Sequence, residues 1–332
     1  MRDPAFWWQP PGTAAALLAP IAKVYGAVAG SRLKQTGRSV GIPVICIGNL
    51  TVGGSGKTPT ALAVARILIA AGKQPYFLTR GYGGELAGPI LVDTAVHRAY
   101  DVGDESLLLA RVAPTVVAAD RAAGAELIRA AGADVIVMDD GFQNPSLAKD
   151  LSILAVDGRR AIGNGKVFPA GPLRAPLETQ LDRAQAVLII GEMSDEAGLL
   201  AAAKSRGLPL LHGRLQPDPK ALDAIAQHPV FAFAGIGNPE KFFATLREAR
   251  IDVRLRNAFP DHHRYRGSEI LALVVRAERE GLVLVTTEKD LMRLSGEPDA
   301  AGLLDVLRVL PVTLQVTEAD AFARLVLGAA AA

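Results

Sequence analysis

The stretch GNLTVGGSGKTP, residues 48–59, decides the fold. It follows the apolar run 43–48 and precedes a helical pattern over 57–71, which is the strand–loop–helix context of a phosphate-binding loop. Its glycines let backbone N–H groups turn toward phosphate oxygens, Lys57 supplies a point charge, and the Thr58 hydroxyl is a ligand for Mg²⁺. The nucleotide-binding residues expected from this loop are Thr51, Val52, Gly53, Gly54, Ser55, Gly56, Lys57 and Thr58.

One position departs from the usual G-x-x-x-x-G-K-[ST] pattern. Its first glycine would fall at residue 51, where this chain has threonine. Gly53 and Gly54 restore conformational freedom within the loop. The alternative, a chance glycine-rich turn, would not explain why strand, loop and helix fall in register.

A pair of carboxylates follows a second buried strand. Residues 135–138 are apolar, and Asp139 and Asp140 come directly after them. Since ligands of parallel sheets bind at the carboxyl ends of the strands, we expect this pair beside the loop. Either carboxylate would hold Mg²⁺ directly or through water. The alternative is a capping role on the turn at Gly141.

Short apolar runs alternate with helical patterns along most of the chain, which indicates a mostly parallel α/β sheet with helices on both faces. The expected strands are 43–48, 75–79, 114–118, 134–139, 152–156, 187–190, 282–286 and 309–316, and the apolar run VFAFAG begins a second block near Pro229. The expected helices are 57–71, 104–112, 120–131, 195–206, 238–249, 268–279 and 318–328. Mixed polarity and two prolines place a domain boundary within 208–228. We therefore predict an N-terminal membrane-associating segment over 1–40, a P-loop NTPase-like core over 41–215 and a smaller C-terminal α/β domain over 216–332.

Composition excludes several classes of protein. Half of the 332 residues are hydrophobic, which excludes global disorder, and the net charge of +2 excludes a chain built to wrap nucleic acid. The single cysteine, Cys46, excludes an intrachain disulfide. With five scattered histidines there is no ligand set for a zinc cluster. A reducing, cytosolic compartment fits this composition.

The positive charge is concentrated at the amino-terminal end. Residues 1–40 carry five basic groups and one acid, whereas the other 292 residues hold 31 basic and 33 acidic groups. No charged side chain occurs from Pro4 to Ala22, where both tryptophans, Trp7 and Trp8, lie. Prolines interrupt this run, so we expect no spanning helix but an interfacial helix that docks on an anionic membrane surface. The alternative is a helix packed on its own domain.

The chain lacks the sequence marks of a guanine-reading switch. In Thr287-Glu288-Lys289-Asp290 the lysine directly precedes the aspartate, which is not the spacing of N-K-x-D. The D-x-x-G pattern is likewise absent at Asp139-Asp140-Gly141. A catalyst is therefore favoured over a regulatory GTPase.

A set of short motifs occurs in a fixed order along the chain. They are GNLTVGGSGKTP (48–59), LTRGYGG (78–84), GDE (103–105), DR (120–121), DDGFQ (139–143), PAGPLR (169–174), FPDHHRY (259–265) and TTEKD (286–290). Together they resemble the tetraacyldisaccharide 4′-kinase family, the lipid A 4′-kinases of Gram-negative bacteria. The resemblance implies transfer of the γ-phosphoryl group of Mg-ATP to the 4′-hydroxyl of a tetraacylated glucosamine disaccharide 1-phosphate. It also implies work at the cytoplasmic face of the inner membrane, and we infer no obligate protein partner.

The resemblance also assigns a catalytic pair. The aspartate of GDE and the first histidine of DHH carry over to Asp104 and His262, and Lys57 of the loop joins them as a catalytic residue. Asp104 would accept the hydroxyl proton, while His262 would orient it or share the charge. The alternatives are an N-cap role for Asp104 and a solvated turn for His262 and His263.

Further candidates extend the expected site. We expect Glu105 at the metal or its water shell, together with the ligands named above. Arg80 and Arg121 are candidates for the substrate 1-phosphate or for ATP phosphate, because guanidinium groups match phosphate oxygens; surface salt bridges are the alternative. Trp7 and Trp8 are expected to contact the lipid.

Two positions depart from the family pattern: Ser106 stands where proline is expected, and Asn144 where histidine is expected. Lys289 and Asp290 could be structural or contact nucleotide. Two other functions stay open, a P-loop enzyme with a soluble substrate and a membrane-recruited ATPase that acts as a switch. Exposed tryptophans argue against the first, and a proton acceptor at Asp104 argues against the second.

Overall fold

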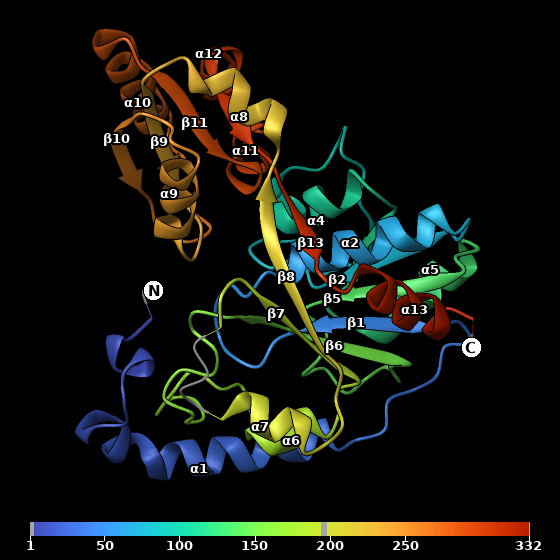
Figure 1. Cartoon of the computed structure of the whole chain (residues 1–332). Coiled ribbons are helices and arrows are strands. Elements are labelled where there is room, and N and C mark those ends of the chain that lie inside the picture. Colours follow the sequence, from blue (N-terminus) through green and yellow to red (C-terminus); the bar gives the residue numbers. More distant parts are fainter. Residues whose placement is uncertain (1–2, 194–197, 332) are drawn as a thin grey trace.

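The computed structural model describes residues 3–193 and 198–331, which form two α/β units (Figure 1). The larger unit is built on a nine-stranded sheet. Its strands, in spatial order, are β13 (Val312–Val316), β8 (Leu210–Pro217), β7 (Ala186–Ile190), β6 (Leu151–Asp157), β1 (Val44–Gly48), β5 (Val135–Asp139), β2 (Pro75–Thr79), β4 (Thr115–Val117) and β3 (Ile90–Leu91). All neighbours from β8 to β4 pair in parallel, whereas β13 and β3 are antiparallel edge strands. The predicted fold class is confirmed.

The central strands are apolar along their whole length because helices cover both faces of the sheet. Every residue of β1, β5, β6 and β7 is buried. Cys46 is fully buried in β1, and burial raises the pKa of its thiol to about 12. It is therefore a small core residue, as its sequence context indicated.

Two sets of helices sandwich the larger sheet. One face is covered by α2 (Lys57–Ala70), α4 (Asp104–Ala110) and α13 (Ala319–Ala329). The other face carries α5 (Arg121–Ala130), α6 (Leu177–Leu181) and α7 (Leu199–Lys204), with α1 (Thr13–Leu33) packed on α6. Residues 195–197 of the expected helix 195–206 lie outside the described residues. A short helix, α3 (Ala99–Val102), precedes α4, and a 3-10 turn, η1 (Ala5–Trp8), precedes α1.

The smaller unit has a four-stranded parallel sheet of its own. Its strands, in spatial order, are β10 (Val253–Ala258), β9 (Val230–Ala234), β11 (Val283–Thr287) and β12 (Arg308–Leu310). Helices α8 (Pro219–Ala226) and α9 (Pro239–Glu248) cover one face. The other face carries α10 (Gly267–Glu280), α11 (Glu288–Leu294), the 3-10 turn η2 (Pro298–Ala300) and α12 (Ala301–Val306).

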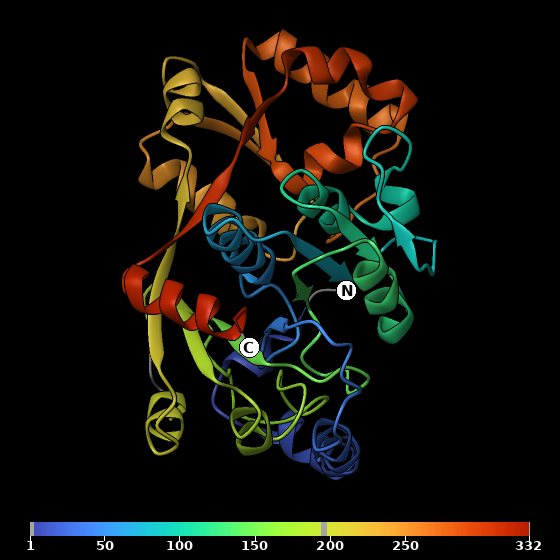
Figure 2. The same cartoon turned by 90° about the vertical axis from the view of Figure 1, so that its right-hand side faces the viewer.

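The chain crosses between the two units twice, along β8 and β13 (Figures 1 and 2). These strands pair antiparallel, from Val312 opposite Pro217 to Val316 opposite Gly213. The expected strand 309–316 is therefore two strands, one in each sheet, separated by Pro311. Consequently the expected C-terminal domain 216–332 is not one continuous piece, because β13 and α13 return to the larger unit.

Helix α1 begins after Pro10, Pro11 and Gly12 and runs without a break from Thr13 to Leu33, so the expected interruption is wrong for Pro20. Pro20 lies inside the helix, and both it and Ala16, four residues earlier, lie on the exposed side. The carbonyl that Pro20 leaves without a donor is thus on the open side of the helix. By length and composition, α1 is the one helix of the described residues that could cross a membrane.

Candidate active site

The phosphate-binding loop connects β1 to α2 at the carboxyl edge of the larger sheet. Gly53 and Gly56 have φ angles of +100° and +86°, in the left-handed region that favours glycine. Thr51 needs no such freedom: its carbonyl accepts hydrogen bonds from Asn49 Nδ2 at 2.6 Å and from Arg174 Nε at 3.1 Å. The threonine that departs from the loop pattern is therefore a fixed anchor of the loop.

The two carboxylates at the end of β5, Asp139 and Asp140, lie at this loop, as their position in the sequence predicted. Thr58 Oγ1 donates to Asp139 Oδ2 at 3.1 Å, and Lys57 Nζ lies 3.7 Å from Asp140 Oδ2. Burial and the charge of Glu105 raise the pKa of Asp139. Burial opposes ionisation of Asp140 too, but the charges of Lys57 and Arg174 outweigh it and lower the Asp140 pKa.

Some polar atoms at this loop have no partner in the described residues. They are Asp139 Oδ1, Ser55 Oγ and Asn49 Oδ1, all buried. Unpaired buried polar atoms are costly, so their concentration here indicates a place for a ligand. No group of three or more His, Cys, Asp or Glu side chains in the described ranges could hold a metal by itself. Mg²⁺ is usually held by one or two protein ligands together with substrate phosphates.

Asp104 and His262 come together across the two units, which their separation in the sequence does not reveal. His262 Nδ1 lies 3.2 Å from Asp104 Oδ1, and Asp104 is 3% exposed at the start of α4. The hydrogen bond to Asp104 raises the pKa of His262. His263 instead pairs with Glu269 at 2.9 Å and stacks on Phe259, so His262 is the partner of Asp104.

Arg293 of α11 fixes the other oxygen of Asp104. Its Nε and Nη2 donate to Asp104 Oδ2 at 2.8 and 2.5 Å, and its Nη1 donates to Asp290 Oδ1 at 2.8 Å. Burial alone would raise the pKa of Asp104, but the His262 hydrogen bond and the Arg293 charge hold that pKa well below its usual range. Asp104 is thus a firmly ionised carboxylate.

Two residues of the TTEKD motif, Lys289 and Asp290, contact other parts of the protein. Asp290 is fully buried and accepts hydrogen bonds from Tyr265 Oη at 2.8 Å and from Gly235 N at 3.0 Å, so it holds the smaller unit together around Arg293. Lys289 Nζ donates to Glu105, which joins the two units a second time. Burial would raise the pKa of Glu105, but the Lys289 charge lowers it. Glu105 therefore forms an ion pair with Lys289 beside the phosphate-binding loop.

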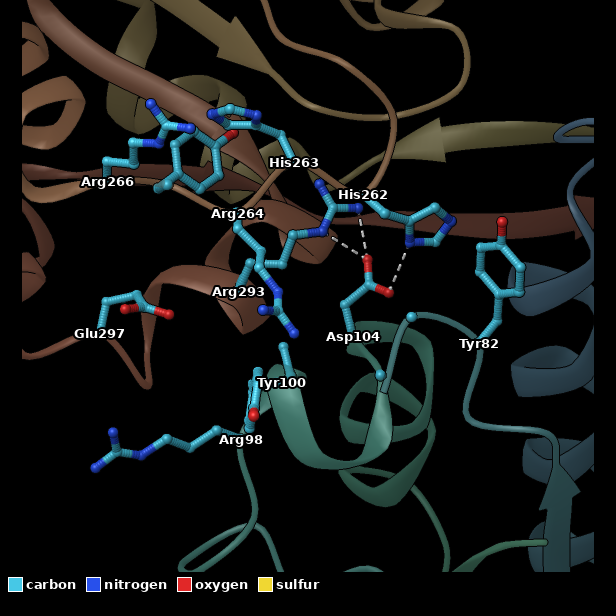
Figure 3. Close-up of a pocket in the computed structure, with 14 residues that line it drawn as sticks. Tyr82, Arg98, Tyr100, Asp104, His262, His263, Arg264, Arg266, Arg293 and Glu297 are labelled. Atoms are coloured by element: carbon cyan, nitrogen blue, oxygen red, sulfur yellow. Dashed lines mark hydrogen bonds and ion pairs between the residues drawn. The ribbon is translucent and has the colours of Figure 1, made fainter. Parts of the chain in front are cut away.

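A cavity of about 680 Å³ opens between the two units at the Asp104–His262 pair (Figure 3). The larger unit contributes Tyr82, Arg98 and Tyr100 to its lining, and the smaller unit contributes residues of the 262–266 stretch. The ring of Tyr82 meets His262 edge-on, with 4.9 Å between centroids. The pair at the cavity is therefore open to a ligand and flanked by an aromatic ring.

The four residues expected to bind substrate lie outside this cavity lining. Arg80 is exposed, whereas Arg121 is 3% exposed and donates to the carbonyl of Ala118. Trp7 is 5% exposed, and its Nε1 donates to Pro169 O at 3.0 Å. The expectation of two exposed tryptophans is therefore wrong, since Trp7 is part of the core.

Trp8 is also engaged by the protein itself. Its ring lies under the guanidinium of Arg160, with 4.5 Å between the group and the ring centroid.

The two positions that depart from the family pattern make local contacts. Ser106 is fully buried in the first turn of α4, and Asn144 accepts a hydrogen bond from Ser146 in a local turn. Neither departure from the expected pattern touches the Asp104–His262 pair.

Two arginines of the site were missed from the sequence. Arg174 donates to Asp140 at 2.9 Å, and its position at the end of PAGPLR was the available signal. Arg293 lies beyond TTEKD, the last of the motifs, and nothing in the surrounding sequence indicates a functional role for it. It could only be found once the fold brought α11 to α4.

The sheet order, the loop at the carboxyl end of β1 and the carboxylates at the end of β5 define a P-loop nucleotide-binding protein. A search of protein families matches residues 14–331 to the model described as tetraacyldisaccharide-1-P 4′-kinase. The chain belongs to this family.

Curated relatives agree along almost the whole length. The tetraacyldisaccharide 4′-kinase of Methylobacterium sp. (strain 4-46) is 56% identical over 322 residues, covering 97% of this chain and 95% of the relative. That of Rhodopseudomonas palustris (strain BisA53) is 52% identical, covering 98% and 95%. A solved structure, the "apo" form of LpxK from Aquifex aeolicus in complex with ATP, superposes with a TM-score of 0.73 at 24% identity, covering 95% of this chain and 99% of that one. That likeness supports the fold.

Proposed function

We propose that this chain transfers the γ-phosphoryl group of Mg-ATP to the 4′-hydroxyl of a tetraacylated glucosamine disaccharide 1-phosphate. The observation that carries the proposal is the Asp104–His262 pair, which faces a cavity, while Glu105, the residue after Asp104, interacts with the charge of Lys57 in the phosphate-binding loop. A nucleotide switch has no need of an ionised carboxylate–imidazole pair that is open to a second ligand. The family match over residues 14–331 supports this acceptor.

The residues at the loop fit Mg-ATP. Lys57 offers a cation to the phosphates, and the positive end of α2 faces the same place. Thr58 and Asp139 would hold Mg²⁺, since Asp139 Oδ1 is buried without a partner. When bound, the metal neutralises charge on the β- and γ-phosphates. Asp140 lies between Lys57 and Arg174 and keeps both cations in place.

The Asp104–His262 pair would remove the proton of the acceptor hydroxyl. Because Arg293 holds Asp104 as a carboxylate of low basicity, we assign proton uptake to the imidazole of His262. Its Nδ1 is engaged by Asp104, so its Nε2 is the atom that receives the proton. Asp104 then stabilises the imidazolium that forms. This reverses the roles that the resemblance implied for the two residues.

Helix α1 supports association with a membrane surface. Its small residues Gly26 and Gly30 pack on the protein near Pro176. The opposite side presents Leu17, Ile21, Val24 and Val28, which are 81%, 59%, 67% and 58% exposed. Such an unpaired apolar stripe, with basic residues at its end, suits the interface of an anionic leaflet. We place the enzyme at the cytoplasmic face of the bacterial inner membrane, where ATP is present.

Activity is tested with purified protein, γ-labelled ATP and the tetraacyl disaccharide 1-phosphate in detergent micelles. We expect label in the lipid, and none with Lys57→Ala as the control. ATP hydrolysis without labelled lipid would contradict the proposal and favour a switch ATPase. Labelling of a soluble sugar but not of the lipid would favour a kinase with a soluble substrate.

Membrane docking is tested by flotation with vesicles that contain phosphatidylglycerol. Leu17→Glu with Ile21→Glu should lower binding about tenfold or more, because two apolar side chains lose their burial in lipid. The matched control is Leu271→Glu with Val275→Glu on α10, a pair with the same spacing and similar exposure. Equal binding of the two double variants would count against docking through α1.

A further inference from the structure

We propose that the 166–169 loop is a second membrane contact of this protein, beside helix α1, and that it binds the headgroup region of an anionic leaflet. The proposal rests on the membrane association proposed above and extends it from one helix to a surface made of two chain segments. We call this surface the anchor patch. It consists of the exposed residues Ile21, Tyr25 and Val28 of α1 and Lys166 and Phe168 of the loop.

The loop and the helix pack against each other, so their exposed side chains adjoin. Val167 is half-buried and turns toward α1, since a Cβ on Gly26 would lie 3.5 Å from Val167 Cγ1. The ring of Phe168, the next residue, contacts the ring of Tyr25, with 5.3 Å between centroids. Phe168 and Tyr25 remain 38% and 41% exposed in spite of this contact. The aromatic pair therefore extends the apolar surface of α1 onto a second segment.

Helical spacing places Tyr25 on one flank of the exposed stripe of α1. It lies four residues after Ile21 and three before Val28, and residues at these spacings are neighbours on a helix surface. The packed side of α1 has buried residues from Ala15 to Leu33, so the helix lies flat against the protein over its whole length. Figure 1 shows it on the side of the larger unit that is away from the smaller unit. This side is therefore open to a flat surface.

The charges around the anchor patch favour an anionic surface. Residues 4–38 contain four basic residues and no acidic residue, and residues 158–176 likewise contain four basic residues and no acidic residue. Arg32, four residues after Val28, and Lys166, two residues before Phe168, are both exposed. Basic and aromatic side chains together are typical of the level where a protein meets lipid headgroups. A second copy of this chain is a poorer occupant, because it would bring like charges face to face.

The same loop is hydrogen-bonded to the phosphate-binding loop, which gives the second contact a function. Phe168 N donates to Leu173 O at 2.9 Å, and Val52 N donates to Pro172 O at 2.8 Å. A leaflet bound at the anchor patch would therefore lie at a fixed distance from the phosphate-binding loop. Because the acceptor named by the family is a lipid, this contact would hold the nucleotide at one height above the leaflet that contains the acceptor.

The first test places an environment-sensitive fluorophore on Phe168→Cys in the full-length chain. The native Cys46 is fully buried, so it does not compete for the label. When vesicles that contain phosphatidylglycerol are added, the emission should shift to shorter wavelength and gain intensity, because the dye moves from water into the interface. The matched control is Val306→Cys on α12 of the smaller unit, which is 47% exposed and should show no shift.

The second test measures flotation with the same vesicles. Phe168→Glu should lower the partition coefficient roughly 5–30-fold, because an apolar side chain loses its burial in lipid. Phe168→Leu should retain most of the binding, and Val306→Glu should bind as the wild type does. Equal circular dichroism and thermal midpoints without lipid show that the variants are folded.

Each contrary result is distinct. If the label at residue 168 stays in water while the wild-type protein floats, the second contact is wrong and docking through α1 remains. A wild-type protein that does not float overturns the membrane association proposed above, and this inference with it. A spectral shift that depends on protein concentration without vesicles would identify a second copy of the chain as the occupant and overturn the proposal. Since neither test measures phosphoryl transfer, a failure of the kinase assignment would appear separately, in the micelle assay.

Discussion

Both carboxylate oxygens of Asp104 are hydrogen-bonded, and this determines the role of Asp104 in proton transfer. Arg293 occupies one carboxylate oxygen and His262 the other, with Asp104 almost completely buried. A carboxylate held in this way has little tendency to accept a proton, but it stabilises a neighbouring imidazolium strongly. The catalytic strength of the pair therefore depends on the negative charge of Asp104.

The first prediction follows from that charge. Asp104→Asn keeps the shape but removes the charge that stabilises the His262 imidazolium, so the pair loses its function in proton removal and kcat should fall by roughly 10²–10⁴-fold, the usual range for general acid–base catalysis. The Kd for ATP should stay nearly constant, because Asp104 does not touch the nucleotide loop. Single-turnover kinetics and equilibrium ATP titration measure the two quantities. A variant with near-normal turnover would remove Asp104 from the mechanism.

A second prediction concerns pH. The hydrogen bond from Asp104 raises the pKa of His262 in the folded state. Its contribution to the free energy of unfolding is therefore fully present below about pH 6.5, the unfolded value, and is lost as pH rises through the folded pKa. His262→Gln should destabilise the protein more at pH 5.5–6 than at pH 9, as measured by urea unfolding. A deficit that does not change with pH would contradict the predicted shift.

At the scale of elements, the phosphate-binding loop is tightly constrained at one glycine. Gly56 has a positive φ of +86°, and a Cβ there would lie 2.5 Å from Ile190 Cδ1 at the end of β7. Gly72, after α2, has a φ of +78° with nothing within 4 Å of its Cβ position. The two sites share backbone strain but differ in crowding.

We therefore predict that Gly56→Ala costs more than Gly72→Ala. Strain alone should cost about 1–2 kcal/mol at either site, and the clash should add about 1–3 kcal/mol at Gly56. Gly56→Ala should also weaken ATP binding, since it moves the loop, whereas Gly72→Ala should not. Urea unfolding and ATP titration of both variants provide the comparison. Equal effects would show that Ile190 does not limit the loop.

Some features of the helices, strands and loops were predictable from the sequence and others were not. The loop, Lys57, Thr58 and the Asp139–Asp140 pair were predictable, because each is defined by neighbours a few residues away and by the rule for parallel strands. The continuity of α1 through Pro20 was not predictable. It depends on whether the carbonyl of Ala16, which Pro20 leaves without a donor, faces solvent, and the tertiary packing of the helix decides this. The division of 309–316 into two strands was not predictable either, since both halves are apolar enough to belong to either sheet.

Contacts between the units could not be predicted from spacing at all. Arg293 and Asp104 are 189 positions apart, and nothing in their neighbourhoods links them. The resemblance to a family supplied the Asp104–His262 pair but not Arg293. It also supplied the DR motif, whose Arg121 is buried on Ala118 O rather than in the cavity. Residues that meet only through tertiary structure have no local signal.

At the scale of the molecule, Arg293 holds the two units together. It is 7% exposed and lies between Asp104 of one unit and Asp290 of the other. Arg293→Ala should lower the free energy of unfolding by about 3–5 kcal/mol, because it leaves buried carboxylates without their cation. Arg279→Ala, an exposed control, should change it by less than about 0.5 kcal/mol. Chemical denaturation measures both, and a small effect of Arg293→Ala would mean that water replaces the lost cation.

The return of β13 to the larger sheet has a consequence for biosynthesis. A ribosome makes the chain from its amino terminus, so β13 and α13 emerge only after the whole smaller unit. Until then β8 is an unpaired edge strand, and the apolar surface that Phe322 and Val326 of α13 cover is open to water. The first unit to begin folding is thus the last to be finished. A nascent chain stalled within the smaller unit would expose a ready site for aggregation or for a chaperone.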